Sequence, residues 1–421
     1  MNTVFQPAEI LLPDFQKTDG TRWAVVACDQ YTSDADYWKK AAEFVGDAPS
    51  TLRLMLPEIY LGKNDAARIE SIHAEMRKAL QTVLQKHPNC MIYLERRLEG
   101  GKLRRGLIGK VDLEAYDYNK GSASLIRATE GTVLERIPPR VAVRRGAPLE
   151  MPHVLLLIDD PKKTVIEPLA EGLTEKLYDF DLMAGGGHVT GFALSQKEQE
   201  RAISALAALI TPEAMKEKYG GADLAPLLFA VGDGNHSLAS AKAYYEEIKA
   251  KIGSAALSHP ARYALCEVNN LHDDDLEFEP IYRVVFGTDP KDLIDSFRAA
   301  VAKLNGKAKP QQVTLLCGGK EETVEIAAPE KQLPVGTVQL FLDEYLKKHP
   351  GVRVDYIHGT DTVRRLVAEG NGNVGFLFAG MEKDELFRTV IYDGALPRKT
   401  FSMGRAQDKR FYLECRRIEA E

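Results

Sequence analysis

Residues 227–252 read LLFAVGDGNHSLASAKAYYEEIKAKI and change from one periodicity to another at a pair of glycines. The unbroken apolar run that ends at Val231 predicts a buried strand, and the apolar side chains at helical spacing from Leu238 onward predict a helix. Gly232 and Gly234 separate the two, because a residue without a side chain can adopt a positive φ in a sharp turn. The segment therefore predicts a strand, a glycine turn and a helix in direct succession.

The turn itself could bind an anion. The first N–H groups of a helix have no acceptor within the helix, and the helix dipole adds partial positive charge at the same place. Asn235 could cap the helix, while His236 and Ser237 could donate hydrogen bonds to a phosphate or carboxylate. Asp233 could hold a magnesium ion or orient His236. The alternative is a turn whose polar side chains bond only their own backbone, and the spacing matches neither the Walker pattern nor G-x-G-x-x-G.

The composition indicates an ordinary folded protein without a general attraction for polyanions. The chain has 421 residues, of which 44% are hydrophobic and 28% are charged, close to the usual globular proportions. Lys and Arg number 55 and Asp and Glu 61, so the net charge is −6 and nucleic acid is not an expected partner. The lack of a signal-like N-terminus and of an apolar run of about 20 residues predicts a cytoplasmic protein without a membrane partner. The five cysteines form no C-x-x-C pair, so neither a disulfide framework nor a thiolate zinc site is expected.

Similar patterns predict further elements on both sides of the glycine turn. Strands are expected over residues 22–28, 140–144 and 153–161, a hairpin over 91–113, and helices starting at Ser33–Asp34 and over 64–87 and 197–210. The strand over 153–161 is nearly all apolar and therefore suits the centre of a sheet. We expect three regions: an N-terminal α/β region over 1–120, a core over 121–290 that contains the glycine turn, and a C-terminal α/β region over 291–421.

Charged segments elsewhere could join the anion site. Arg140 and Arg144 would share one face of a strand and could bind a carboxylate or phosphate, unless they form a solvated sheet edge. Arg398 and Lys399 could neutralise a phosphate or form a charged surface turn. The acids after His272 could coordinate Mg²⁺ or lie in a solvated loop. No HExxH, GxSxG or Cys/His signature is present, so protease and serine hydrolase functions have little support.

Seven segments make nearly the whole chain similar to a known family. They are VACDQYT (26–32), EGTVLERIPPR (130–140), PHVLLLIDDP (152–161), GDGNHS (232–237), EPIYRVV (279–285), DYIHG (355–359) and LPRKTFSMG (396–404). The chain resembles a bacterial and archaeal family of unknown function known as "DUF ten-fifteen". That family is similar in turn to the fold shared by ParB nucleotide-binding domains, sulfiredoxin and the archaeal free serine kinase, where the equivalent turn binds nucleotide or phosphate.

The resemblance implies a mixed α+β fold. Its centre would be a ParB/sulfiredoxin-like core, elaborated with an N-terminal α/β region and additional C-terminal strands and helices. The chain departs from the family pattern at three places. Asn235 stands where the family often has His, Ser237 replaces an Arg that would contact phosphate, and Tyr282 replaces a His. These departures put a shared reaction in question and leave anion binding as an expectation.

The turn and the resemblance together lead to a kinase hypothesis. The chain would be a phosphotransferase that uses ATP or ADP with Mg²⁺ and acts on a small polar metabolite such as an amino acid, and it could form a homodimer. Asp233 would hold the metal, and the proton of the acceptor hydroxyl would pass to Glu135 or Asp29. The catalytic residues would be Asp233, His236, Glu135 and Asp29. The phosphate or nucleotide would be bound by Gly232, Gly234, Asn235, Ser237, Arg283, Arg398 and Lys399.

Two alternatives stay open at this point. A non-catalytic regulatory protein could hold a nucleotide or anionic metabolite at the same turn, as the departures from the family motif permit. A metal-dependent hydrolase would need Asp233, His236, His188 and His272 to meet in space around one ion. Binding without turnover would favour the first alternative, and a stoichiometric metal would favour the second.

Overall fold

A computed structural model gives the fold of residues 4–420, apart from 62, 64, 222–223, 371 and 403. Two units make up the chain, and each contains both helices and sheet. The larger unit is formed by the residues up to 128, by 132–276 and by those from 404 onward, and the smaller unit by 129–131 and 277–403. The α+β fold class expected from the sequence is confirmed, while the ParB/sulfiredoxin-like identity of the core stays a prediction.

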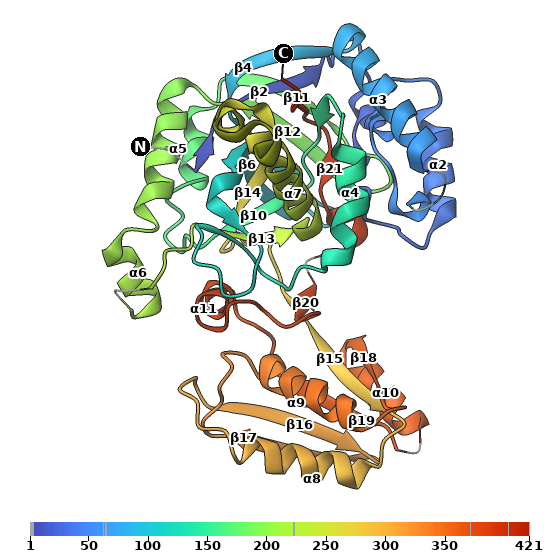
Figure 1. The fold of residues 1–421 in the computed structure, drawn as a ribbon, viewed down its shortest axis with the longest axis vertical. Helices are drawn as coiled ribbons and strands as arrows, with labels where there is room; N and C mark the ends of the chain where they lie inside the picture. The colour runs from blue at the N-terminus through green and yellow to red at the C-terminus, as the bar shows by residue number, and fades with distance from the viewer. Residues whose placement is uncertain are drawn as a thin grey trace. The chain divides into compact units, whose positions relative to one another are not determined.

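The larger unit is built on a mixed sheet (Figure 1). Its strands are β1 (Phe5–Gln6), β5 (Ile92–Arg97), β6 (Leu103–Asp112), β7 (Tyr116–Asp117), β8 (Ile126–Ala128), β10 (Leu155–Ile158), β11 (Glu175–Asp181), β12 (His188–Ala193), β13 (Phe229–Asp233) and β14 (Tyr263–Asn270). Within the described residues their order is β11-β12-β5-β6-β14-β10-β13-β8-β7, with β1 paired to β6. β10 is antiparallel to β13 and parallel to β14, and its four residues are buried. The prediction of a central strand here is confirmed.

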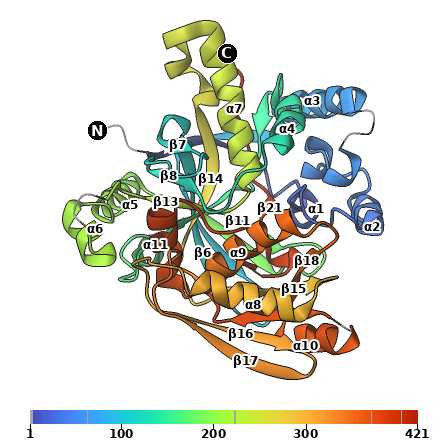
Figure 2. The same ribbon diagram turned by 60° about the horizontal axis from the view of Figure 1, so that its bottom comes forward.

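Helices cover both faces of this sheet. They are α1 (Gly20–Trp23), α2 (Ala35–Val45), α3 (Asp65–Thr82), α4 (Ile137–Arg144), α5 (Gln196–Ala208), α6 (Pro212–Tyr219) and α7 (Asn235–Ile252). Ile92 and Leu94 of β5 face a core that includes α2 and α3, whereas Tyr93 between them faces a second core that includes α5 and α7. This alternation follows from the two-residue period of a strand. Helix α4 packs against α7 (Figure 2).

Short two-stranded pairs complete the larger unit, and two of them hold the C-terminal segment against earlier parts of the chain. They are β2 (Ala8–Pro13) with β4 (Leu84–Cys90), β3 (Val25–Val26) with β21 (Phe411–Tyr412), and β9 (Leu149–Glu150) with β22 (Arg416–Arg417). The indole Nε1 of Trp23 also donates to the carbonyl of Leu413 at 2.9 Å. Because of these pairs, Tyr412 lies beside the segment that follows β3.

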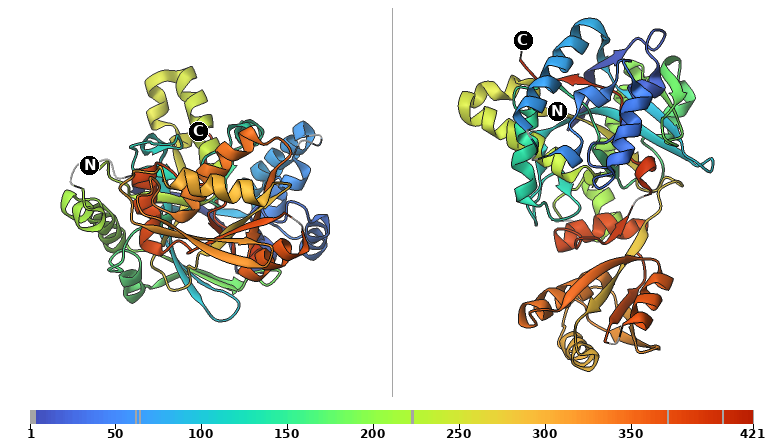
Figure 3. Two further views of the ribbon diagram at one scale, coloured as in Figure 1. Left: turned by 90° about the horizontal axis from the view of Figure 1, so that it is seen from below. Right: turned by 90° about the vertical axis from the view of Figure 1, so that its right-hand side faces the viewer.

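The smaller unit has its own sheet, in the order β17-β16-β19-β15-β18, with β20 paired to β15. Its elements are β15 (Glu279–Phe286), α8 (Pro290–Val301), β16 (Gln311–Cys317), β17 (Lys320–Ile326), α9 (Pro334–Lys348), β18 (Arg353–His358), α10 (Thr360–Glu369), β19 (Val374–Phe378), α11 (Lys383–Asp393) and β20 (Phe401–Ser402). Phe297 of α8 packs on Phe376 of β19, while Val363 of α10 lies over the neighbouring Gly375. Helices α8 and α10 therefore cover opposite faces of the sheet (Figure 3).

Three sequence-based predictions of secondary structure are wrong in part or in full. The strand expected over 22–28 is limited to Val25–Val26, because Asp19 caps a helical turn before it. The helix expected to reach residue 87 ends at Thr82, and β4 follows it. The strand expected over 140–144 is helix α4, whose first turn accommodates Pro138 and Pro139 because the N–H groups there need no partner.

Other predicted elements are confirmed. The hairpin over 91–113 is β5–β6, Asp34 caps α2, and α5 begins with a capping box at Ser195. The glycine turn joins β13 to α7 as expected. The two expected boundaries, near residues 120 and 290, fall inside the larger and the smaller unit, respectively. The division of the chain into three regions stays a prediction. No helix among the described residues has both the length and the apolar character that crossing a bilayer requires.

Candidate functional site

The glycine turn is held tightly against the start of β10. Gly234 occupies the cap position before α7 with φ 77°, and a Cβ there would lie 3.0 Å from the Cα of Val154. The amide of Gly234 donates to Oδ1 of Asp233 at 2.9 Å, and Oδ2 of the same carboxylate lies 3.3 Å from Nζ of Lys409. The predicted helix cap by Asn235 is wrong, since Gly234 takes the cap position and makes no side-chain cap bond.

The first turn of α7 leaves two amides open. The amides of Ser237 and Leu238 both donate to the carbonyl of Gly234 at 3.0 Å. Those of Asn235 and His236 have no acceptor among the described residues. The side-chain Oδ1 of Asn235 is buried and is likewise without a partner in the described part of the chain. The end of α7 therefore offers two N–H donors and the positive end of the helix dipole to an anion.

His236 faces a cluster of charges. Its Nε2 accepts a hydrogen bond from the amide of Val133 at 3.3 Å. Burial, and then the charges of Arg140 and Arg136, lower the pKa of His236, while Asp29 opposes them. The imidazole is therefore held in its neutral form.

The two predicted acids lie in the same part of the larger unit. Asp29 follows β3 and is half-exposed. Glu135 is exposed in the short 3₁₀ helix Leu134–Arg136, two residues from the amide that bonds His236. The structure thus brings Asp29 near His236, and Glu135 stands at the same edge on a surface turn.

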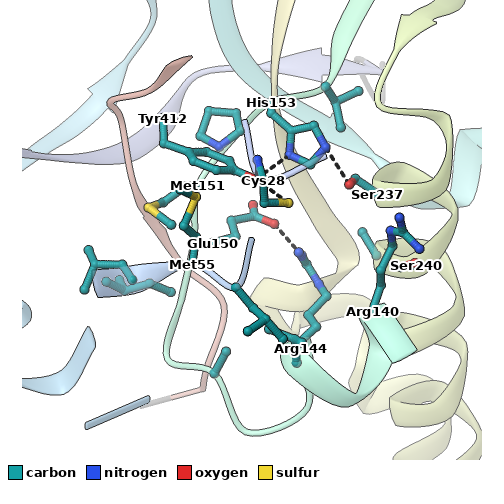
Figure 4. A pocket seen from close by; sticks show the side chains of 18 of the residues that line it. Cys28, Met55, Arg140, Arg144, Glu150, Met151, His153, Ser237, Ser240 and Tyr412 are labelled. Carbon is teal, nitrogen blue, oxygen red and sulfur yellow. Dashed lines mark hydrogen bonds and ion pairs between the residues drawn. The ribbon is translucent and has the colours of Figure 1, made fainter. Parts of the chain in front are cut away.

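A chain of hydrogen bonds runs from α7 to the C-terminal segment (Figure 4). Oγ of Ser237 lies 2.7 Å from Nε2 of His153, and Nδ1 of His153 lies 2.9 Å from the hydroxyl of Tyr412. That hydroxyl donates to Sγ of Cys28 at 3.0 Å and accepts from the Cys28 amide at 3.3 Å. Burial raises the pKa of the Cys28 thiol to about 12 and also raises the pKa of Tyr412, so both stay protonated near neutral pH.

These side chains line a cavity of about 160 Å³. Most of its wall is apolar and comes from the segment after α2, from α4 and from β9 and the residues after it: Leu54, Met55, Leu56, Val143, Leu149 and Met151. Two ion pairs also line it, Arg140 with Glu58 and Arg144 with Glu150. Burial alone would raise the pKa of Glu150, but Arg416 and Arg144 outweigh it and lower the pKa.

Arg140 and Arg144 do share one face, as predicted, although for a different reason. Residues four apart lie on the same side of a helix, so the change from strand to α4 keeps both guanidinium groups toward the cavity. Each of them already has a carboxylate partner, and neither forms a solvated sheet edge.

The predicted phosphate-binding cations of the last third belong to the smaller unit. Arg283 is fully buried, and its guanidinium donates to Gln339 Oε1 and to the carbonyls of Ile281, Arg398 and Lys399. Its role as a phosphate ligand is therefore withdrawn, because its donors are used within the unit. Arg398 is exposed and pairs with Asp343 at 3.3 Å. Lys399 is exposed at a positive φ of 56°.

The ligands of the hydrolase hypothesis do not meet. His188 bonds Asp179 and Asp181 on the β11–β12 hairpin, and His272 bonds Asp159. Asp233 is occupied by Lys409 and by its neighbouring amide. Among the described residues no three His, Cys, Asp or Glu side chains form a group that could hold a metal ion. We therefore reject the hypothesis of a metal-dependent hydrolase.

The sequence-based prediction missed His153, Tyr412 and Cys28 as members of the site. Of these three residues, only His153 stands out in the sequence, because it is a polar residue at the start of a strongly apolar strand. The pairing of Tyr412 with Cys28 spans 384 positions and depends on the β3–β21 pair. No local pattern reports such a contact.

Several solved structures have a distant similarity to this chain. A free serine kinase mutant in complex with AMP shows 12% identity and a TM-score of 0.37, over 72% of this chain and 95% of that one. A conserved hypothetical protein from Pyrococcus furiosus shows 12% identity and a TM-score of 0.32, over 72% and 96% of the two chains. SbnI with a C-terminal truncation, from Staphylococcus aureus, shows 12% identity and a TM-score of 0.33, over 70% and 82%. No curated protein matches the chain.

The family resemblance drawn from the seven sequence segments is also confirmed. The sequence profile that matches is described as "Protein of unknown function (DUF1015)" and covers residues 12–345, most of the chain. The chain belongs to this family.

Proposed function

We propose that the chain is a phosphotransferase that binds the phosphate groups of a nucleotide, ATP or ADP, at the N-terminal end of α7. The observation that carries the proposal is the pair of open amides of Asn235 and His236. An anion at a helix N-terminus gains about 0.3–1 kcal/mol from the dipole, and up to about 2 kcal/mol where it is partly buried. Lys409 is held next to the turn by Asp233 and can shift to a bound phosphate.

The acceptor hydroxyl would lose its proton to Asp29 or Glu135. Asp29 supports this role better, because its charge already acts on His236 in the first turn of α7. The substrate would be a small polar metabolite that approaches the turn from solvent, since Glu135 is exposed and Asp29 is partly exposed. Positioning and neutralisation of charge by amides and cations account for most of catalysis in phosphoryl transfer.

The residues present do not form a magnesium site by themselves. Both oxygens of Asp233 already have protein partners, and the described residues place no second and third carboxylate with it. Mg²⁺ normally needs about six oxygen ligands, so most would have to come from the nucleotide and water. We derive no catalytic step from the ion.

Calorimetric titration with ATP and with ADP tests the proposal. We expect binding in the micromolar to millimolar range and a clear loss of affinity in Lys409→Gln. Lys242→Gln is the matched control, because Lys242 is a lysine of α7 itself but pairs with Glu246. Phosphorus NMR of the mixture with amino acids and other hydroxyl compounds then measures transfer. If neither nucleotide gives a heat of binding with Mg²⁺ present, the proposal is wrong.

One observation favours a second candidate, a regulatory protein that binds a nucleotide or anionic metabolite without turning it over. Asp233 is paired with Lys409, and Glu135 is exposed on a surface turn, so the described residues fix neither carboxylate against the amides of Asn235 and His236. Binding that is measurable by calorimetry, without any phosphorylated product in the NMR spectrum, would select this candidate.

A further inference from the structure

We propose that Ser237 is a nucleophile activated by His153, and that the adjoining cavity holds the apolar acyl group of an ester whose carbonyl carbon Ser237 attacks. The inference does not rest on nucleotide binding. It rests on the 2.7 Å contact between Oγ of Ser237 and Nε2 of His153, on the orientation of that imidazole by Tyr412, and on the cavity that all three line.

The contacts in this series of hydrogen bonds indicate which atom donates and which accepts at each step. The hydroxyl hydrogen of Tyr412 goes to Sγ of Cys28, so its oxygen acts as an acceptor toward Nδ1 of His153, and the lone pair of the imidazole lies on Nε2, facing Ser237. Nδ1 must then carry the proton and donate it to the oxygen of Tyr412. The hydroxyl of Tyr412 donates in turn to Sγ of Cys28. Ser237, Nδ1 of His153 and Tyr412 each donate to the next member of the series, and His153 is left as a base toward Ser237.

His153 and Tyr412 are in a fixed environment. Their side chains belong to residues that are 7% and 4% exposed, and their rings meet edge to face with centroids 5.4 Å apart. The glycine turn is also close to this ring, since a Cβ on Gly234 would lie 3.3 Å from Cδ2 of His153. A base whose rotamer and tautomer are both fixed meets the requirement for activating a serine. Tyr412 takes the place of the third group that orients the base, so it is a positioning residue.

Other side chains on the cavity wall are poorer nucleophiles. Ser240 donates its hydroxyl to the carbonyl of His236 at 2.6 Å and has no base beside it. Cys28 is kept as a thiol, because burial raises its pKa to about 12. Among the described residues of this wall, Ser237 is therefore the aliphatic hydroxyl in contact with a base, whereas the phenol of Tyr412 meets Nδ1 and orients the ring.

The cavity selects the substrate class. Its wall is mainly Leu, Met and Val side chains, and its charged residues Arg140 and Arg144 are already paired with carboxylates. An uncharged hydrocarbon group gains about 25 cal/mol per Å² by entering such a wall, whereas a charged group would have no free partner. An acyl chain of a carboxylic ester fits this chemistry.

The reaction balances with water as the only co-reactant. Oγ of Ser237 forms a bond to the carbonyl carbon while its proton passes to Nε2 of His153, and the charge on the carbonyl oxygen is stabilised by the open amides of Asn235 and His236. The bond to the alcohol oxygen breaks, and His153 returns the proton to that oxygen. Water, deprotonated by His153, then cleaves the acyl-serine to the acid and restores Ser237.

Labelling with an alkyl fluorophosphonate tests the nucleophile directly. Oγ of Ser237 would form a bond to phosphorus, fluoride would leave, and the mass of the intact protein would rise by one phosphonyl group. Peptide mapping should place the label on Ser237. We expect no label in Ser237→Ala and an unchanged rate in Ser258→Ala, an exposed serine of the same unit that does not line the cavity. No nucleotide is present, so failure here leaves the phosphate site untouched.

Hydrolysis of p-nitrophenyl esters gives a second measurement. We expect p-nitrophenyl butyrate to have a higher kcat/KM than the acetate, and Ser237→Ala to lose at least about 100-fold, the usual contribution of an activated base and nucleophile. Tyr412→Phe should lower kcat and leave KM unchanged, a split that a general loss of packing would not produce. An unlabelled wild-type protein, or equal labelling of Ser237→Ala with an unchanged melting temperature, would overturn the proposal.

Discussion

The substitution Gly234→Ala tests how closely the turn before α7 is packed against the rest of the site. Gly234 has φ 77°, and a Cβ would lie 3.0 Å from the Cα of Val154 and 3.3 Å from Cδ2 of His153. The left-handed conformation costs an alanine about 1–2 kcal/mol. Overpacking against a backbone that cannot retreat adds about 1–3 kcal/mol. We expect the free energy of unfolding of the larger unit to fall by about 2–5 kcal/mol.

Gly220→Ala is the matched control at the end of α6 in the same unit. Gly220 has φ 81° and ψ 6°, the same left-handed region as Gly234, but a Cβ there would meet nothing within 4 Å, so only the conformational cost of about 1–2 kcal/mol applies. Both variants gain the same small stabilisation, about 0.4–1 kcal/mol, from a less flexible unfolded chain. Urea unfolding followed by tryptophan fluorescence suits the test, because Trp23 and Trp38 both lie in the larger unit. Equal losses in the two variants would refute the reasoning, since the contact with Val154 would then add nothing.

Three more predictions follow from buried groups. Glu150→Gln should cost about 3–5 kcal/mol in the same urea assay, because the buried guanidinium of Arg416 loses its charged partner; a loss below 1 kcal/mol would contradict this. Burial and nearby arginines lower the pKa of His236, so its neutral form is favoured on folding and the wild-type protein should lose stability as the pH falls below about 6.5. His236→Gln should remove that part of the pH dependence of Tm, and identical profiles would argue against it. Arg283→Met should speed hydrogen exchange in β15, because the acceptors of a buried guanidinium lose their donors; unchanged exchange there would count against the assignment.

Local patterns predicted the central part of the fold. The β13–α7 segment, the β5–β6 hairpin and the central strand β10 follow from apolar periodicity and from glycines between the elements. Helix α4 shows the limit of this reasoning. Residues 140–144 are a short apolar run between two arginines, as in a strand, but Pro138 and Pro139 favour the first turn of a helix, and α4 packs on α7. The packing of α4 on α7 therefore decides that this segment is a helix and not a strand.

The site was predictable only where it is local. Ser237 lies inside the glycine turn and was found there, although its hydroxyl bonds His153 rather than an open phosphate position. The other members come from segments 84 positions from Ser237 and, for Tyr412, 259 positions from His153. Each of these contacts requires a long-range strand pair, and one sequence carries no record of which distant strands pair. For the same reason Arg283 looked available for phosphate, while the folded unit buries it.

The charges in the cavity also bear on what the chain can accept as a substrate. A free amino acid carries an ammonium and a carboxylate, and each needs an opposite charge where water is excluded. The cavity offers Arg140 and Arg144, but Glu58 and Glu150 already neutralise them. Binding an amino acid there would break one of these partly buried ion pairs and leave a carboxylate without its cation. A polar acceptor therefore belongs outside the cavity, on the solvent side of the α7 turn near Asp29, while the cavity itself suits an uncharged, apolar group.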